Sequence, residues 1–308
     1  MTTLLVIDIG NTNVSIGLYD YQDTAGEGSA SELSHHWRIG THRENTSDEV
    51  GLIVSSLFAQ SRRNADEVDD VVISSVVPPL LPIFERVCTK LFDRPPIIVG
   101  PGIRTGMPVR YENPREVGAD RIVNALAAFE LVGGPVIAVD FGTATTFDCV
   151  SERGEYMGGV IFPGMHTAME ALFEKASMLH RVEIARPKSV IGKTTTCAIQ
   201  SGLLYGYAGV VDSMVARIRE ELGEDAHVIA TGGLAGRVAN ETNTIERVEP
   251  FLTLDGLRLI YEKNRGATRE GPRADGEGRS AAREAGGARS ERPGRRGRGE
   301  RGAPDPAR

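Results

Sequence analysis

The chain opens with Leu4-Leu5-Val6-Ile7-Asp8-Ile9-Gly10-Asn11-Thr12-Asn13-Val14-Ser15-Ile16-Gly17-Leu18-Tyr19, two apolar runs separated by a polar break. A continuous apolar run is typical of a strand buried on both faces. A short polar turn between two such runs predicts an antiparallel hairpin. Asp8 stands at the end of the first strand, and Gly10 lets a ligand approach the backbone closely. The turn suits a phosphate chain with a divalent cation, although Gly and Asn also favour ordinary hairpin turns.

The same pattern returns in the middle of the chain. The apolar run Val136–Val139 leads into Asp140, and Gly142 and Thr143 follow. A third apolar run, from Val228, enters the turn Gly232-Gly233. We therefore predict an internal repeat in which each half starts with a hairpin and then adds strands and helices. Two similar sheets side by side would bring the three turns to one cleft between domains, a common place for a small ligand.

Between the hairpins, the first half is predicted to add a strand, a helix, a strand, a helix and a strand. The polar stretch 21–32 predicts a long surface loop before a strand at 36–39. A capping box formed by Thr46 and Glu49 marks the start of the first helix. Later helices are expected over 118–131, 165–173 and 198–222.

The 308 residues suffice for two domains, which we assign to 1–117 and 118–264, with a tail over 265–308. The tail is rich in Arg and Gly, carries a net charge of +5 and almost lacks large apolar side chains, so we expect it to be disordered. The whole chain carries −7, so the rest carries −12. An acidic body fits an enzyme of small metabolites and argues against nucleic-acid binding.

Targeting and redox signals are weak throughout the chain. The first residues lack a signal-peptide pattern, and no apolar run approaches the ~18 residues of a membrane-spanning helix. Cys88, Cys149 and Cys197 are far apart, with neither metal-site nor disulfide spacing, as in a reducing compartment. We therefore predict a cytoplasmic protein that does not contact a membrane.

The three turns in this order resemble the superfamily of acetate and sugar kinases, Hsp70 and actin. Within it, the ordered motifs resemble the type III pantothenate kinase family: Asp8-Ile9-Gly10-Asn11-Thr12, then Gly118-Ala119-Asp120-Arg121, then Asp140-Phe141-Gly142-Thr143-Ala144-Thr145-Thr146. Further similar segments are Ser75-Val76-Val77-Pro78, Tyr111 ahead of Pro114, Gly158-Gly159 through Pro163-Gly164, and Gly192-Lys193 leading to Gln200-Ser201-Gly202. The resemblance covers about residues 2–263, and the ordered set is far more specific than Asp-x-Gly alone. It implies an α/β fold of two duplicated ribonuclease-H-like domains, the actin-like ATPase fold, with a nucleotide cleft between them.

The Asp120–Arg121 pair supplies candidate chemistry for a phosphoryl transfer. Asp120 falls in the first turn of a predicted helix and could accept the proton of a nucleophilic hydroxyl. Arg121 could bind a carboxylate through two hydrogen bonds. Without the resemblance, an ordinary surface ion pair would be the commoner explanation. With it, the implied substrate is pantothenate, phosphorylated by ATP to 4'-phosphopantothenate in the first step of coenzyme A biosynthesis, with Asp120 as the base.

The resemblance also implies the remaining site residues. The ATP contacts are Asp8, Ile9, Gly10, Asn11, Thr12, Asn13, Val14, Ser15 and Thr143. The pantothenate contacts are Tyr111, Gly118, Ala119, Asp120, Arg121 and Thr195. Thr195 is expected to reach the partner's site in a homodimer, although the run Thr194-Thr195-Thr196 leaves its register open.

Two cations are implied beside ATP. Asp8 is expected to hold Mg²⁺ or a similar divalent ion through water, because Mg²⁺ keeps much of its hydration. Asp140 is expected to bind a monovalent cation, K⁺ or NH₄⁺. On physical grounds alone, Asp140 would serve Mg²⁺ equally well.

Two other functions remain open. One is a non-catalytic regulatory or accessory protein on the same ATP-binding scaffold, which the intact Asp8, Asp120, Arg121 and Asp140 disfavour. The other is a nucleic-acid-processing protein with a ribonuclease-H-like core. The acidic body disfavours it, as does the Gly232-Gly233 turn, which suits a nucleoside.

Overall fold

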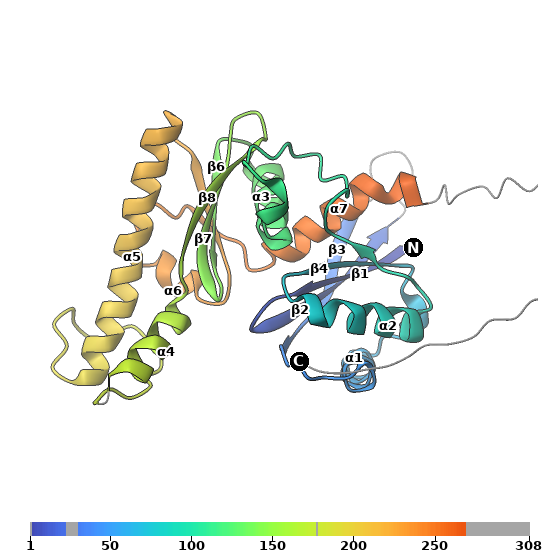
Figure 1. The fold of residues 1–308 in the computed structure, drawn as a ribbon, viewed down its shortest axis with the longest axis horizontal. Helices are drawn as coiled ribbons and strands as arrows, with labels where there is room; N and C mark the ends of the chain where they lie inside the picture. The colour runs from blue at the N-terminus through green and yellow to red at the C-terminus, as the bar shows by residue number, and fades with distance from the viewer. Residues whose placement is uncertain (1, 23–29, 177, 269–308) are drawn as a thin grey trace, which may run out of the picture. The chain divides into compact units, whose positions relative to one another are not determined.

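Two five-stranded mixed sheets with the same topology carry the fold (Figure 1). Sheet A has the order β3-β2-β1-β4-β5, and sheet B has the order β8-β7-β6-β9-β10. In both, the first three strands are antiparallel neighbours and the last two join in parallel. The strands of sheet A are β1 (Thr2–Ile9), β2 (Asn13–Gln22), β3 (Ala30–Gly40), β4 (Asp70–Ser75) and β5 (Ile97–Ile98). Those of sheet B are β6 (Val136–Phe141), β7 (Ala144–Val150), β8 (Tyr156–Pro163), β9 (His227–Thr231) and β10 (Arg247–Val248). The predicted α/β fold with an internal repeat is confirmed.

Helices cover both faces of each sheet. They are α1 (Ser47–Gln60), α2 (Leu81–Phe92), α3 (Ala119–Val132), α4 (Met165–Lys175), α5 (Thr195–Leu222), α6 (Ala235–Ala239) and α7 (Leu252–Thr268), with short 3₁₀ turns at Ala65–Glu67, Pro78–Leu80 and Pro114–Glu116. Helices α1 and α2 pack side by side on one face of sheet A, and α5 lies along sheet B on the face opposite α3 (Figure 1). Helices α3 and α7 share one apolar core with the facing sides of both sheets.

The alternation of side chains along the first strand of each sheet aims its aspartate at this shared core. Successive residues of a strand point to opposite faces. Val6 belongs to the shared core, so Asp8, two residues on, points the same way. In β6, Ala138 belongs to the shared core and Asp140 follows at the same spacing. The duplicated topology therefore turns both aspartates inward, toward one region between the sheets.

The computed structural model describes residues 2–22, 30–176 and 178–268. The predicted disorder of residues 269–308 falls outside this part of the chain, but α7 extends to Thr268, so the first residues of the predicted tail are helical. The predicted loop over 21–32 is too long, because β2 continues to Gln22 and β3 begins at Ala30. Edge strand β3 has one face open to water, so its polar residues are compatible with a strand.

Helix α7 and the short elements α6 and β10 are absent from the sequence-based expectations. Leu257 and Ile260 of α7 are fully buried in the shared core, and α7 packs against α3 as well as β1 and β4. The predicted boundary between domains 1–117 and 118–264 remains a prediction, because α7 follows sheet B in the chain but packs on sheet A. No helix in the described ranges is long and apolar enough to cross a membrane.

Candidate functional site

The structure brings the turns of the two hairpins together. The hydroxyl groups of Thr12 and Thr143 lie 2.8 Å apart within hydrogen-bonding distance. Each turn is closed by a bond from its glycine amide, Gly10 N to Asn13 O and Gly142 N to Ala144 O, both at 3.0 Å. The first turn is also braced by Thr41, whose hydroxyl donates to Gly10 O at 2.7 Å. Polar groups from both repeats therefore converge on one place, as predicted.

The third turn reaches the same place. Gly232 has a φ of +94°, and a Cβ atom there would lie 2.5 Å from Asp140 Oδ1. No side chain fits between this turn and the carboxylate, so glycine is required on both grounds. Asp140 thus lies between the second and third turns.

Asp8 is a half-buried carboxylate held by the neighbouring parallel strand. Its Oδ1 accepts a hydrogen bond of 2.6 Å from the Ser74 hydroxyl, and the two residues are paired in the β1–β4 ladder. The pKa of Asp8 is raised to about 6, chiefly by burial and also by the negative charge of Asp120, while the Ser74 bond and the charge of Arg38 oppose the rise. A nearby cation would stabilise the charged form of a carboxylate whose pKa is raised in this way.

Asp140 is held by a chain of polar side chains from the two central helices. Asn124 Nδ2 donates to Asp140 Oδ2 at 3.1 Å, and the Thr253 hydroxyl donates to Asn124 Oδ1 at 2.7 Å. The pKa of Asp140 is raised to about 7, chiefly by burial and also by the charges of Asp120 and Asp8. Asn124 and Thr253 were not predicted. The sequence feature that could have indicated Asn124 is its polar amide within the otherwise apolar run Ile122–Ala128.

Asp120 lies in the first turn of α3, as predicted. Its Oδ1 accepts a hydrogen bond of 2.9 Å from the backbone N–H of Arg121. Burial raises its pKa above the usual range, and that bond and the Arg121 charge oppose the rise. A Cβ atom on Gly118 would lie 2.5 Å from Asp120 Oδ1, so a larger residue there would displace the carboxylate. A half-buried carboxylate of raised pKa at a helix start is suited to accept a proton.

Arg121 forms its ion pair with Asp148, not with Asp120. Its Nε donates to Asp148 Oδ1 at 2.7 Å, and the Tyr156 hydroxyl donates to the same oxygen at 2.9 Å. The Thr146 hydroxyl donates to Asp148 Oδ2 at 3.1 Å. Burial raises the pKa of Asp148 to about 6 although all three partners favour its charged form. The ordinary surface pair between Asp120 and Arg121 is therefore not what the structure contains.

The guanidinium of Arg121 keeps one donor unused. Arg121 is 7% exposed, and its Nη2 has no hydrogen-bond partner in the described part of the chain. Gly159 lies close to this nitrogen, since a Cβ atom there would be 3.0 Å from it. The neighbouring Gly158, where φ is +109°, lies close to the Tyr111 ring, at 3.5 Å from the position of a Cβ atom. Because a buried donor without a partner is costly, this nitrogen is suited to an acceptor from a ligand.

The other predicted residues of the first turn differ in where their side chains point. Ile9 and Val14 are buried in the apolar cluster on the α1–α2 face, so only their backbone faces the turn. The amide oxygen of Asn11 accepts a hydrogen bond of 3.0 Å from Arg43. Ser15 lies opposite Asp8 in the β1–β2 ladder. In the described ranges, no group of three or more His, Cys, Asp or Glu side chains is placed to hold a metal ion by itself.

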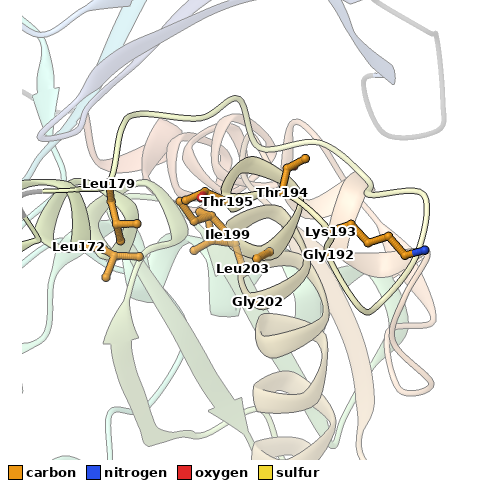
Figure 2. A pocket seen from close by; sticks show the side chains of 10 residues that line it. Leu172, Leu179, Gly192, Lys193, Thr194, Thr195, Ile199, Gly202 and Leu203 are labelled. Carbon is orange, nitrogen blue, oxygen red and sulfur yellow. The ribbon is translucent and has the colours of Figure 1, made fainter.

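Thr195 lies apart from these residues. It lines an open groove of about 710 Å³ at the start of α5, with Leu172, Leu179 and Ile199 among its neighbours (Figure 2). Within the described ranges, no hydrogen bond or ion pair joins Thr195 to Asp120 or Arg121. Lys193 is exposed, and Figure 2 shows its amino group pointing away from the leucines.

The sequence was compared with models of known protein families. The sequence model of type III pantothenate kinase matches residues 4–217. This chain belongs to the type III pantothenate kinase family. Curated members of the family resemble it over nearly their whole length. One from Syntrophus aciditrophicus (strain SB) is 55% identical over 261 residues, which are 85% of this chain and 99% of the relative. One from Moorella thermoacetica is 49% identical over 261 residues, again 85% and 99%.

The family resemblance inferred from the ordered motifs is thus confirmed. A third relative, from Pelobacter propionicus, is 52% identical over 262 residues and is covered completely. Among solved structures, a Baf family transcriptional activator from Campylobacter jejuni has the same fold, with a TM-score of 0.51, 16% identity, and coverage of 85% of this chain and 99% of that one. At such identity the structural likeness speaks for the fold alone.

Proposed function

We propose that this chain transfers the terminal phosphoryl group of ATP to the hydroxyl of pantothenate, producing 4'-phosphopantothenate for coenzyme A biosynthesis. Its family membership supports the reaction class. The observation that carries the proposal is the half-buried Asp120 carboxylate, whose pKa is raised, followed in the first turn of α3 by Arg121, whose Nη2 has no partner in the described ranges. A substrate with a hydroxyl and a carboxylate can use both groups at once.

Each part of the site takes a role in this reaction. The turns at Gly10–Thr12 and Gly142–Thr143 bind the phosphate chain through backbone amides and hydroxyl groups. Asp120 accepts the proton of the attacking hydroxyl. Arg121 binds the pantothenate carboxylate through its free nitrogen, with Tyr111 packed nearby. Phosphoryl transfer needs mainly positioning and charge neutralisation, and this arrangement of side chains provides both.

The cations belong with Asp8 and Asp140. The residues present fit positive ions, because the charge of Asp120 raises the pKa of both Asp8 and Asp140, and the charge of Asp8 raises that of Asp140 further. Asp8 would hold a divalent ion such as Mg²⁺ through water, and the ion would neutralise phosphate charge. Asp140 would hold a monovalent ion, K⁺ or NH₄⁺, with Asn124 and Thr253 orienting its carboxylate.

A homodimer would complete the site with Thr195. Leu172, which lines the groove at Thr195, is 43% exposed, and Val190 and Ile191, just before the lining residue Gly192, are 67% and 81% exposed. Such a surface favours association with a second copy. In the dimer, Thr195 of one protomer would contact the pantothenate held by Arg121 of the other.

Mixing two inactive variants tests this arrangement. Asp120→Asn lacks the base, and Thr195→Ala lacks the contact offered to the partner. In a mixed dimer one site recovers both residues, so we expect activity well above that of either variant alone, measured after unfolding and refolding the mixture. Activity no higher than the average of the separate variants would contradict a shared site.

The assay of the proposed function is pantothenate-dependent release of ADP. Purified chain is incubated with ATP, Mg²⁺ and K⁺, with and without pantothenate. We expect ADP release only with pantothenate. No turnover would contradict the proposal and favour the non-catalytic accessory role. The likeness to the Campylobacter jejuni protein does not support that role, because at 16% identity it shows the fold alone. A cytoplasmic location remains a prediction from composition.

A further inference from the structure

Arg38 occupies the same row of sheet A as Asp8. Asp8 is paired with Ser15 on β2, and Ser15 is paired with Arg38 on β3. Residues directly opposite one another on neighbouring strands point to the same face of a sheet. The side chain of Arg38 therefore lies on the face that carries Asp8, the face turned toward the second repeat.

The guanidinium group reaches the second repeat. A Cβ atom on Gly233 would lie 3.3 Å from Arg38 Nη1. Gly233 follows Gly232, whose backbone lies against Asp140. Arg38 thus extends from the edge strand of sheet A to the glycine turn that borders Asp140.

This arginine is exposed, and its charge acts on Asp8 without a direct bond. In the described ranges it takes part in no ion pair and no side-chain hydrogen bond. Arg63 and Arg121, by contrast, are engaged: Arg63 pairs with Asp20 at 2.7 Å, and Arg121 pairs with Asp148. The site beside Arg38 is rich in carboxylates, so an incoming phosphate chain needs positive charge to offset repulsion.

The segment that follows Arg38 is built around the first phosphate turn. The Thr41 hydroxyl donates to Gly10 O, and the Thr41 amide donates to Thr12 O at 3.0 Å. Arg43 donates to the Asn11 side chain. The end of β3 is therefore fixed to the turn, and Arg38 is the cation of this segment left free for a ligand.

We propose that Arg38 binds the triphosphate of ATP, on the side of the phosphate chain that faces the Gly232-Gly233 turn. The inference rests on the proposed kinase function and adds a phosphate-binding residue to it. A guanidinium group is suited to the task because its planar fork matches two phosphate oxygens. The same side chain links the two repeats through the nucleotide.

The test compares Arg38→Ala, Arg38→Lys and wild type in the full-length chain. Inorganic tripolyphosphate serves as a competitor of ATP, because it carries the phosphate chain without the nucleoside. For Arg38→Ala we expect the KM for ATP and the inhibition constant of tripolyphosphate each to rise about 10- to 100-fold, as for loss of a charge-assisted contact. The KM for pantothenate should change by less than about threefold. Arg38→Lys should lie between, because it keeps the charge and loses the fork.

Arg86→Ala is the matched control. Arg86 is exposed on α2, which packs on the opposite face of sheet A, and its replacement should leave both constants at wild-type values. A tripolyphosphate constant for Arg38→Ala within about twofold of wild type would overturn the inference. An equal rise in the KM for pantothenate would also overturn it. Should Arg38→Ala unfold, Arg38→Lys carries the same comparison.

Failure of the inference about Arg38 can be distinguished from failure of the proposed kinase function. If wild type binds ATP but does not phosphorylate pantothenate, the proposed function fails, and displacement of bound ATP by tripolyphosphate still decides the role of Arg38. If pantothenate is phosphorylated and the variants bind tripolyphosphate like wild type, the inference about Arg38 fails alone.

Discussion

Asp120→Asn should lower kcat for pantothenate phosphorylation by about 10²- to 10⁴-fold while leaving the KM for ATP nearly unchanged. Asparagine has almost the same shape but cannot accept the proton of the attacking hydroxyl. The first turn of α3 should survive, because the amide oxygen can still accept the hydrogen bond from Arg121 N–H. Burial raises the pKa of Asp120, so the acid limb of the wild-type pH profile of kcat should lie above the ordinary range of an aspartate.

Asp48→Asn provides the control for this variant. Asp48 lies in the first turn of α1, as Asp120 does in α3, but it is exposed and paired with Lys90 at 2.8 Å. Its replacement should leave kcat unchanged. Full activity of Asp120→Asn would show that another group accepts the proton.

Arg121→Gln should raise the KM for pantothenate by about 100-fold and destabilise the fold by about 3–5 kcal/mol. The first effect follows from loss of the free nitrogen offered to the carboxylate. The second arises because Asp148, which is fully buried, loses its only ion pair in the described ranges. The single variant therefore changes both pantothenate binding and the stability of the fold, and it does not tell the two effects apart.

The double variant Arg121→Gln with Asp148→Asn separates them. Removing the carboxylate removes the uncompensated buried charge, so most of the lost stability should return in a urea unfolding curve. The KM for pantothenate should stay high. A double variant with wild-type KM for pantothenate would refute the role of Arg121 as the carboxylate contact.

The ordered turns allowed the fold and the convergence of the site to be predicted from the sequence. Apolar runs ending in Asp-x-Gly indicated two hairpins, and the contact between Thr12 and Thr143 agrees with the expected meeting of their turns. These features are local, so a pattern of a few residues specifies them. Helix α7 was harder to predict, because its burial depends on both sheets being in place.

The partners of the site residues depend on register and could not be predicted. Asp148 sits in the interior of a strand, and nothing in its neighbours indicates that it faces Arg121 from 27 positions away in the sequence. Arg38 was placed in a strand, but its alignment with Asp8 needs the pairing of three strands. Asn124 acts through Asp140, which lies on a different element. Such contacts are tertiary, and the chain encodes them only through the complete fold.

The most direct test of the central claim is the mass of pantothenate after incubation with the chain, ATP, Mg²⁺ and K⁺. The proposed site predicts that pantothenate gains one phosphoryl group for each ADP released, and that Asp120→Asn forms almost none. Release of ADP without phosphorylated pantothenate, or equal product from Asp120→Asn, would contradict it.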